Sequence, residues 1–104
     1  MQVKNIFENI KIDKSVEEFI TLNQNQNIKI ERIVSNGQKS KENFWYEQKE
    51  NEFVLLLEGF AILEFEDKEV ILKKGDYLNI PAYIKHRVKY TCEDNPTLWL
   101  AIFY

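Results

Sequence analysis

Cysteine, histidine, glycine and proline are all scarce in this 104-residue sequence, which contains one Cys, one His, three Gly and two Pro. Because Cys92 is alone, no internal disulfide can form, as is typical of proteins from a reducing compartment. The longest near-apolar run covers residues 53–57, whereas a membrane-spanning helix needs about 20 apolar residues. Residues 1–15 alternate apolar with polar side chains and lack the apolar segment of a signal peptide. We therefore expect a cytoplasmic protein without a membrane partner.

The chain also lacks an excess of positive charge, since 14 Lys and Arg residues stand against 17 Asp and Glu residues. Binding of nucleic acid through phosphate contacts needs a basic patch, and the sequence shows none. It also shows no pair of helices of the kind that DNA-binding motifs use. We therefore expect no nucleic-acid partner.

Apolar residues are sufficient for one domain. Hydrophobic residues make up 44% of the chain and aromatic residues 13%, which lies in the ordinary globular range. A chain of this length buries roughly two-thirds of its unfolded surface around a single core. One domain is therefore expected, and a second one is excluded.

The only helix signal lies near the N-terminus. Ser15 followed by Val16, Glu17 and Glu18 has the pattern of a capping box, and apolar residues then recur at helical spacing as far as Leu22. The amide-rich stretch NQNQN at 23–27 is typical of a turn. The pattern predicts a short helix over 15–23, within an N-terminal arm of residues 1–27 that packs on the remaining domain.

From residue 28 onward, short apolar runs alternate with turn residues, which indicates an all-β domain over residues 28–104. The predicted strand segments are 28–35, 53–59, 61–66, 69–77, 86–91 and 97–104. The runs 53–57 and 97–104 are apolar at consecutive positions, so both faces of these strands should be covered. A homodimer packed through them is the favoured cover, and the N-terminal helix is the alternative.

Two stretches of this domain carry unusual spacings. In YEQKENEFVLLLEG, residues 46–59, Gln48 follows Tyr46 by two positions, Glu52 comes four positions later, and the stretch ends in a glycine. In GDYLNIPAYIKH, residues 75–86, a glycine is followed by a proline and then by His86. Alternate residues of a strand point to the same face, so positions 46 and 48 can both point inward.

These stretches resemble the two motifs of the cupin superfamily, in particular those of small single-domain bacterial cupins. The first motif contains His-x-His, then Glu and Gly, and the second contains Gly, Pro-x-Gly and His. The resemblance implies a cupin double-stranded β-helix, which is a jelly-roll barrel with one pocket in its mouth. The sequence departs from the family pattern at three positions, because Tyr46 and Gln48 replace the two histidines and Tyr83 replaces a glycine.

The resemblance implies a metal site formed by Tyr46, Gln48, Glu52 and His86. Imidazole is a good ligand for transition metals, whereas a carboxamide is weak and a phenol must first be deprotonated. We therefore expect these four residues to bind a divalent ion such as zinc, nickel, manganese or iron only weakly.

Three functional hypotheses remain open, because one fold supports many activities. The first is a small-molecule binder whose pocket is lined by Tyr46, Gln48, Glu52, Tyr83 and His86, with Tyr90 at its mouth. The second is an enzyme of isomerase, decarboxylase or dioxygenase type that uses Glu52 and His86 as base and acid. The third is a structural module whose pocket is filled by tyrosine side chains, with His86 as a structural residue.

Overall fold

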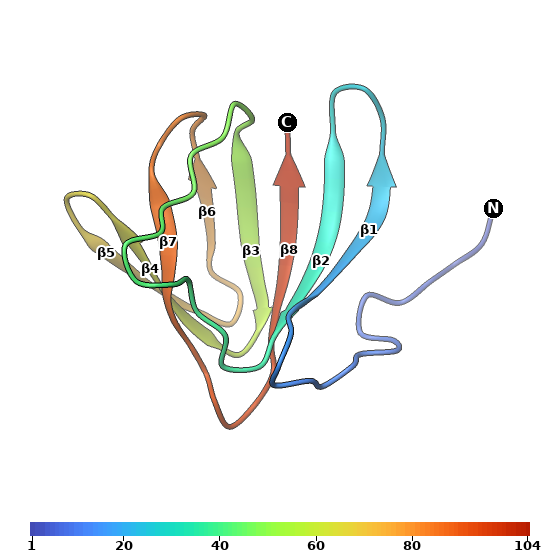
Figure 1. The fold of residues 1–104 in the computed structure, drawn as a ribbon. Coiled ribbons are helices and arrows are strands. Elements are labelled where there is room, and N and C mark those ends of the chain that lie inside the picture. Colours follow the sequence, from blue (N-terminus) through green and yellow to red (C-terminus); the bar gives the residue numbers. More distant parts are fainter.

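A computed structural model describes all residues 1–104 as eight antiparallel strands in two sheets, without a helix (Figure 1). The strands are β1 (Glu18–Gln24), β2 (Lys29–Ser35), β3 (Glu52–Glu58), β4 (Phe60–Phe65), β5 (Glu69–Lys73), β6 (Tyr77–Ile80), β7 (His86–Thr91) and β8 (Thr97–Phe103). The large sheet has the order β1-β2-β8-β3-β6, and the small sheet has the order β5-β4-β7. The chain contains no helix of the length and apolarity required to cross a membrane.

The hydrophobic core lies between the two sheets. Alternate residues of β3 and β8 point inward, so that Val54 and Leu56 pack with Trp99 and Ala101. The small sheet contributes side chains from β4 and β5 to the same cluster. The core comprises Val54, Leu56, Ala61, Leu63, Leu72, Ile80, Trp99 and Ala101. This layering agrees with the all-β architecture predicted from the strand spacing.

The predicted helix over 15–23 is wrong, because this segment forms β1 at the edge of the large sheet. A nine-residue helix has little stability of its own, whereas pairing with β2 satisfies the backbone groups of Glu18–Gln24. The hydrogen bonds expected of the cap belong to a turn instead, in which Asp13 Oδ1 accepts from the backbone nitrogen and hydroxyl of Ser15. Strand pairing therefore begins at Glu18 and not at residue 28.

Gly59 is the single residue between β3 and β4, and it has a positive φ of 97°. A Cβ atom added at this position would lie 2.5 Å from the Thr97 hydroxyl oxygen and 2.7 Å from its Cα atom. Both the backbone conformation and the close approach of β8 therefore require glycine here. This contact explains why the predicted strand pair is interrupted at Gly59.

Residues 1–17, the part of the predicted N-terminal arm that precedes β1, contact Arg32 on the outer face of the large sheet and lie beside β1 (Figure 1). Arg32 projects outward from β2, and its guanidinium donates hydrogen bonds to the carbonyl oxygens of Ile6 and Glu8 at 3.0 and 2.6 Å. It also forms an ion pair with Glu18 at 2.7 Å. The outer-facing Val34 and Leu98 are almost completely buried.

The remaining part of the outer face is apolar and open. The strand register aligns outer-facing side chains across all five strands, and we call these the outer patch: Ile20, Ile30, Phe53, Leu55, Tyr77, Leu100 and Ile102. Tyr77 is 68% exposed and Ile20 38% exposed. Two-sided apolarity of the central strands is thus present, and the arm covers only one end of the outer face.

The homodimer expected from the sequence stays a prediction, with the outer patch as its interface. We expect sedimentation velocity to give a mass near twice the 12.5 kDa of one chain. Ile20→Lys should shift the protein toward monomer, because it places a charge in an interface that excludes water. Ile71→Lys is the matched control, since Ile71 is exposed on the small sheet. A monomeric wild-type protein, or equal effects of the two changes, would contradict the prediction.

Candidate ligand-binding site

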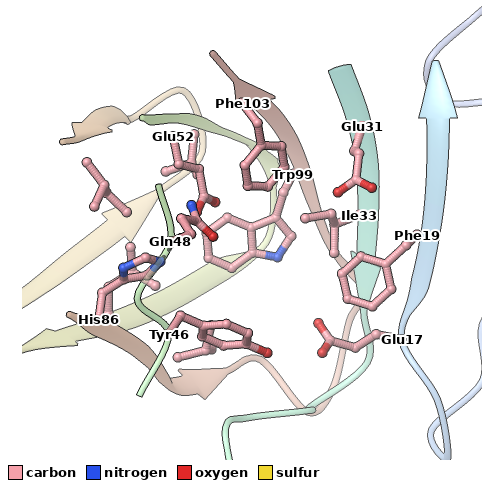
Figure 2. A pocket seen from close by; sticks show the side chains of 14 residues that line it. Glu17, Phe19, Glu31, Ile33, Tyr46, Gln48, Glu52, His86, Trp99 and Phe103 are labelled. Atoms are coloured by element: carbon pink, nitrogen blue, oxygen red, sulfur yellow. Dashed lines mark hydrogen bonds and ion pairs between the residues drawn. The ribbon is translucent and has the colours of Figure 1, made fainter. Parts of the chain in front are cut away.

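A cavity of about 190 Å³ opens between the two sheets at one end of the barrel (Figure 2). Nine of its 14 lining residues are hydrophobic. The lining consists of Glu17, Phe19, Glu31, Ile33, Tyr46, Gln48, Glu52, Val54, Leu63, Ile80, His86, Val88, Trp99 and Phe103. The volume is below the roughly 300–1,000 Å³ of typical ligand pockets, so the site is suited to a small ligand.

Tyr46 and Gln48 reach the cavity from an extended segment that runs beside β7. The backbone nitrogen of Tyr46 donates to the carbonyl oxygen of His86 at 2.8 Å, and the nitrogen of His86 donates back at 3.0 Å. The nitrogen of Tyr83 donates to the carbonyl oxygen of Gln48 at 2.8 Å. These backbone contacts hold the side chains of Tyr46 and Gln48 on the same side as His86, as the alternation in the sequence predicts.

Glu52 is the centre of the polar cluster in this cavity. Its Oε1 atom accepts a hydrogen bond from Gln48 Nε2 at 3.0 Å and lies 3.3 Å from His86 Nε2. The side chain of Glu52 is 13% exposed and that of His86 is 7% exposed. The structure therefore brings together Tyr46, Gln48, Glu52 and His86, the four residues that the two sequence motifs single out.

The contacts of His86 determine where its protons lie. Nδ1 is 2.9 Å from the carbonyl oxygen of Ile84, which can only accept, so Nδ1 carries a proton. A neutral imidazole would then direct the Nε2 lone pair at the carboxylate of Glu52, which is unfavourable. Burial alone lowers the pKa of His86, but the hydrogen bonds to Glu52 and Ile84 outweigh it and raise the pKa above 6.5. The contacts of both ring nitrogens therefore favour the protonated form of His86, as an ion pair with the carboxylate of Glu52.

Stability should depend on this ion pair. Because the pKa of His86 is higher in the folded state, the pair stabilises the fold fully below about pH 6.5, and this contribution is lost as pH rises through the folded value. His86 is the only histidine, so its NMR titration is directly assignable. We expect a pKa above 6.5 in the wild-type protein and a lower pKa in Glu52→Gln. An unchanged pKa in the variant would contradict the assignment.

Tyr83 and Tyr90, which the sequence places around the pocket, do not line it. Tyr83 is 66% exposed and adopts a positive φ of 66°, a conformation that glycine favours and that directs the tyrosine side chain into solvent here. The backbone thus keeps the glycine-like turn of the second cupin motif although the residue is tyrosine.

Tyr90 is displaced from the pocket by a bulge in β7. Val88 pairs with Leu63 and Tyr90 with Ile62, so one extra residue, Lys89, interrupts the alternation. Val88 therefore lines the cavity, whereas Tyr90 projects from the opposite face, where its ring packs against Phe60 at 6.0 Å. No local signal in the sequence marks this bulge.

A second group of lining residues, on β8, on β1 and at the position before β1, was not predicted from the sequence. Trp99 Nε1 donates to the Ser35 hydroxyl at 3.2 Å, and this hydroxyl donates to Glu17 Oε2 at 2.6 Å. The chain of contacts holds Glu17 beside the cavity (Figure 2). Alternation within 97–103 could have placed Trp99 and Phe103 on one face, but Glu17 and Phe19 were assigned to a helix.

The paired sheets, the cavity in the barrel mouth and the motif residues that line it define a cupin. The family described as "Cupin domain" matches residues 32–103, and the chain belongs to this family. No functionally curated protein is detectably similar in sequence.

Among solved structures, a proposed mannose-6-phosphate isomerase from Ralstonia eutropha JMP134 is 36% identical, with a TM-score of 0.95. That comparison covers 99% of this chain and 97% of the other. A cupin superfamily protein from Desulfitobacterium hafniense DCB-2 is 21% identical over 90% of this chain and 82% of the other, with a TM-score of 0.76. The protein TT1209 from Thermus thermophilus is 19% identical over 99% and 96%, with a TM-score of 0.81. The last two likenesses concern the fold alone.

The residues at the cupin ligand positions do not fit a permanently bound transition metal. The structure contains no group of three or more His, Cys, Asp or Glu side chains placed to hold one. Burial, together with the charges of Glu17 and Glu52, raises the pKa of Tyr46 above 10, so its phenol is a poorer ligand than an ordinary tyrosine. Gln48 directs its amide nitrogen, a donor, at Glu52. Only Glu52 and His86 remain as strong ligands.

Removal of metal should therefore leave the protein unchanged. After purification without an affinity tag, we expect mass spectrometry to find substoichiometric metal, and dialysis against EDTA to leave the melting temperature unaltered. The physical reason is that a metal ion would find only two strong ligands, Glu52 and His86, and would compete with a proton for Nε2 of His86. Near-stoichiometric metal that is lost in the double variant Glu52→Gln, His86→Ala would contradict this expectation.

Proposed function

We propose that this cupin binds a small molecule in the barrel cavity. The observation that carries the proposal is an open, mainly apolar cavity into which the Glu52–His86 pair is directed. Binding sites for small molecules combine an apolar lining with a few fixed polar groups, because the apolar walls supply affinity and the polar groups supply orientation. The cavity also argues against a module filled by tyrosines, since Tyr46 is the one tyrosine that lines it.

Fixed polar groups would give the site its selectivity. Glu52 is held by Gln48 and His86, and His86 is held by the carbonyl oxygen of Ile84. A ligand hydroxyl or amine that replaces one of these contacts would be recognised at a defined position. A ligand without such a group could displace these contacts only by leaving the buried carboxylate without compensation, which costs about 1–3 kcal/mol.

An enzyme is the second candidate, and the contact between Glu52 Oε1 and His86 Nε2 at 3.3 Å supports it. A carboxylate and an imidazole in contact can take a proton from one ligand atom and deliver it to another. The relative from Ralstonia eutropha is named as a proposed mannose-6-phosphate isomerase. Glu52 would act as the base and His86 as the acid.

Thermal denaturation in the presence of small amines, alcohols, sugars and sugar phosphates tests the proposed binding. A ligand at 100 times its Kd should stabilise the fold by about 2.7 kcal/mol. Ile33→Trp should abolish this effect, because the indole would fill the cavity. Ile71→Trp, on the exposed face of β5, is the matched control.

The same compounds distinguish the two candidate functions. Conversion of a stabilising compound by the wild-type protein, with loss of turnover in Glu52→Gln, would identify an enzyme. Stabilisation without conversion would identify a binding protein. If no compound acts, or if Ile33→Trp responds like the wild-type protein, the proposed site is wrong.

A further inference from the structure

The cavity is lined by more negative than positive charge. Three acidic residues line it, Glu17, Glu31 and Glu52, and His86 is the only basic residue of the lining. No lysine or arginine belongs to the lining. Even with His86 protonated, the lining therefore carries an excess of two negative charges.

The three carboxylates differ in how they are compensated. Glu52 is paired with His86 at 3.3 Å. Glu31 is paired with Lys29 at 2.9 Å, but the lysine side chain is 46% exposed, so solvent screens this pair. Glu17 accepts a hydrogen bond from Ser35 and has no ion-pair partner in the structure. Counting Lys29 as well, one negative charge remains, and it is that of Glu17.

Aromatic side chains form much of the remaining wall. The lining includes the rings of Phe19, Tyr46, Trp99 and Phe103, which come from β1, the segment before β3, and β8. Figure 2 shows the rings of Phe19 and Tyr46 close to the carboxylate of Glu17, with Trp99 between this side and Glu52. The face of an aromatic ring carries partial negative charge and attracts cations. Rings and carboxylates in one cavity therefore favour the same sign of ligand charge.

The pKa of Tyr46 is sensitive to the negative charges around the cavity. Burial is the largest cause of the raised pKa of its phenol, and the negative charges of Glu17 and Glu52 raise the pKa further. A second negative charge in the cavity is thus disfavoured at the position of this side chain. The same repulsion would act on a phosphate or carboxylate group of a ligand.

We propose that the cavity selects a small organic cation, such as a substituted ammonium ion, whose charge is held between Glu17 and the surrounding aromatic rings. This inference rests on the proposed binding function and specifies the class of ligand. The alkyl groups of such a cation would contact Ile33, Trp99 and Phe103. Its positive centre would supply the ion-pair partner that Glu17 lacks. Sugar phosphates, by contrast, would find no lysine or arginine in the cavity to neutralise them.

A pair of probes with the same shape separates charge from size. Choline and 3,3-dimethylbutan-1-ol differ only in the replacement of the charged nitrogen by carbon. Isothermal titration calorimetry on the wild-type protein should show choline binding roughly tenfold more tightly than the alcohol. Mannose 6-phosphate should bind more weakly than either, and choline affinity should fall with added salt.

Variants assign the effect to the cavity. Glu17→Gln keeps the size of the side chain and its capacity to accept from Ser35, and it should remove most of the preference for choline. Glu66→Gln is the control for net charge, because Glu66 is exposed in the turn between β4 and β5 and should leave the preference intact. The salt dependence on the wild-type protein tests the proposal even if Glu17→Gln folds poorly.

The outcomes separate this inference from the proposed function. Equal binding of choline and the alcohol would overturn the cationic selectivity and leave a small-molecule pocket in place. Tighter binding of mannose 6-phosphate would overturn the selectivity as well and would favour the isomerase candidate. Absence of binding by all three probes would overturn the inference, and the Ile33→Trp denaturation experiment would then decide whether the cavity binds anything.

Discussion

The antiparallel pairing of β8 with both β2 and β3 is the constraint on which the site depends. This register places Ile33 opposite Trp99 and Glu52 opposite Phe103, so that these four side chains line the cavity from one face of the large sheet. The same pairing directs every second side chain of β8 into the core and directs Leu100 and Ile102 to the outer patch, so both faces of the strand are apolar. Core and cavity are therefore built from the same strands, and a shift of one residue in register would exchange the lining for the outer patch.

Replacement of two motif histidines changes the chemistry of the cavity and leaves its position unaltered. Tyr46 and Gln48 still project beside His86, because backbone hydrogen bonds place them there. Gln48 donates a hydrogen bond to Glu52. The contact between Glu52 and His86 favours a proton on Nε2 of His86, whereas a metal would need the lone pair of that atom. A site with fewer imidazoles thus contains a paired carboxylate and imidazole, with an uncompensated carboxylate at Glu17 on its other side.

Most of the strands were predictable, because their apolar runs and flanking turns are local. The segments 28–35, 53–59, 61–66, 86–91 and 97–104 each overlap one strand. The single strand predicted over 69–77 is wrong, because a turn at 74–76 divides this segment into β5 and the start of β6. The helix predicted over residues 15–23 is wrong because a capping pattern and helical spacing are local signals, whereas the strand pairing that overrides them is not local. The placement of Tyr90 at the pocket mouth differs from the structure for a related reason, since the bulge at Lys89 inverts the alternation on which that placement relied.

By itself, the sequence determined the all-β fold, the positions of the central strands and the convergence of Tyr46, Gln48, Glu52 and His86. The strands and the shared face of Tyr46 and Gln48 follow from local spacings and strand geometry, whereas the placement of Glu52 and His86 beside them was implied by the cupin resemblance. Only the tertiary structure decided that Glu17 and Phe19 border the cavity, that Tyr83 and Tyr90 do not, and that Trp99 holds Ser35 against Glu17. Such contacts join segments up to 64 positions apart, and the packing of two sheets sets them rather than any local pattern.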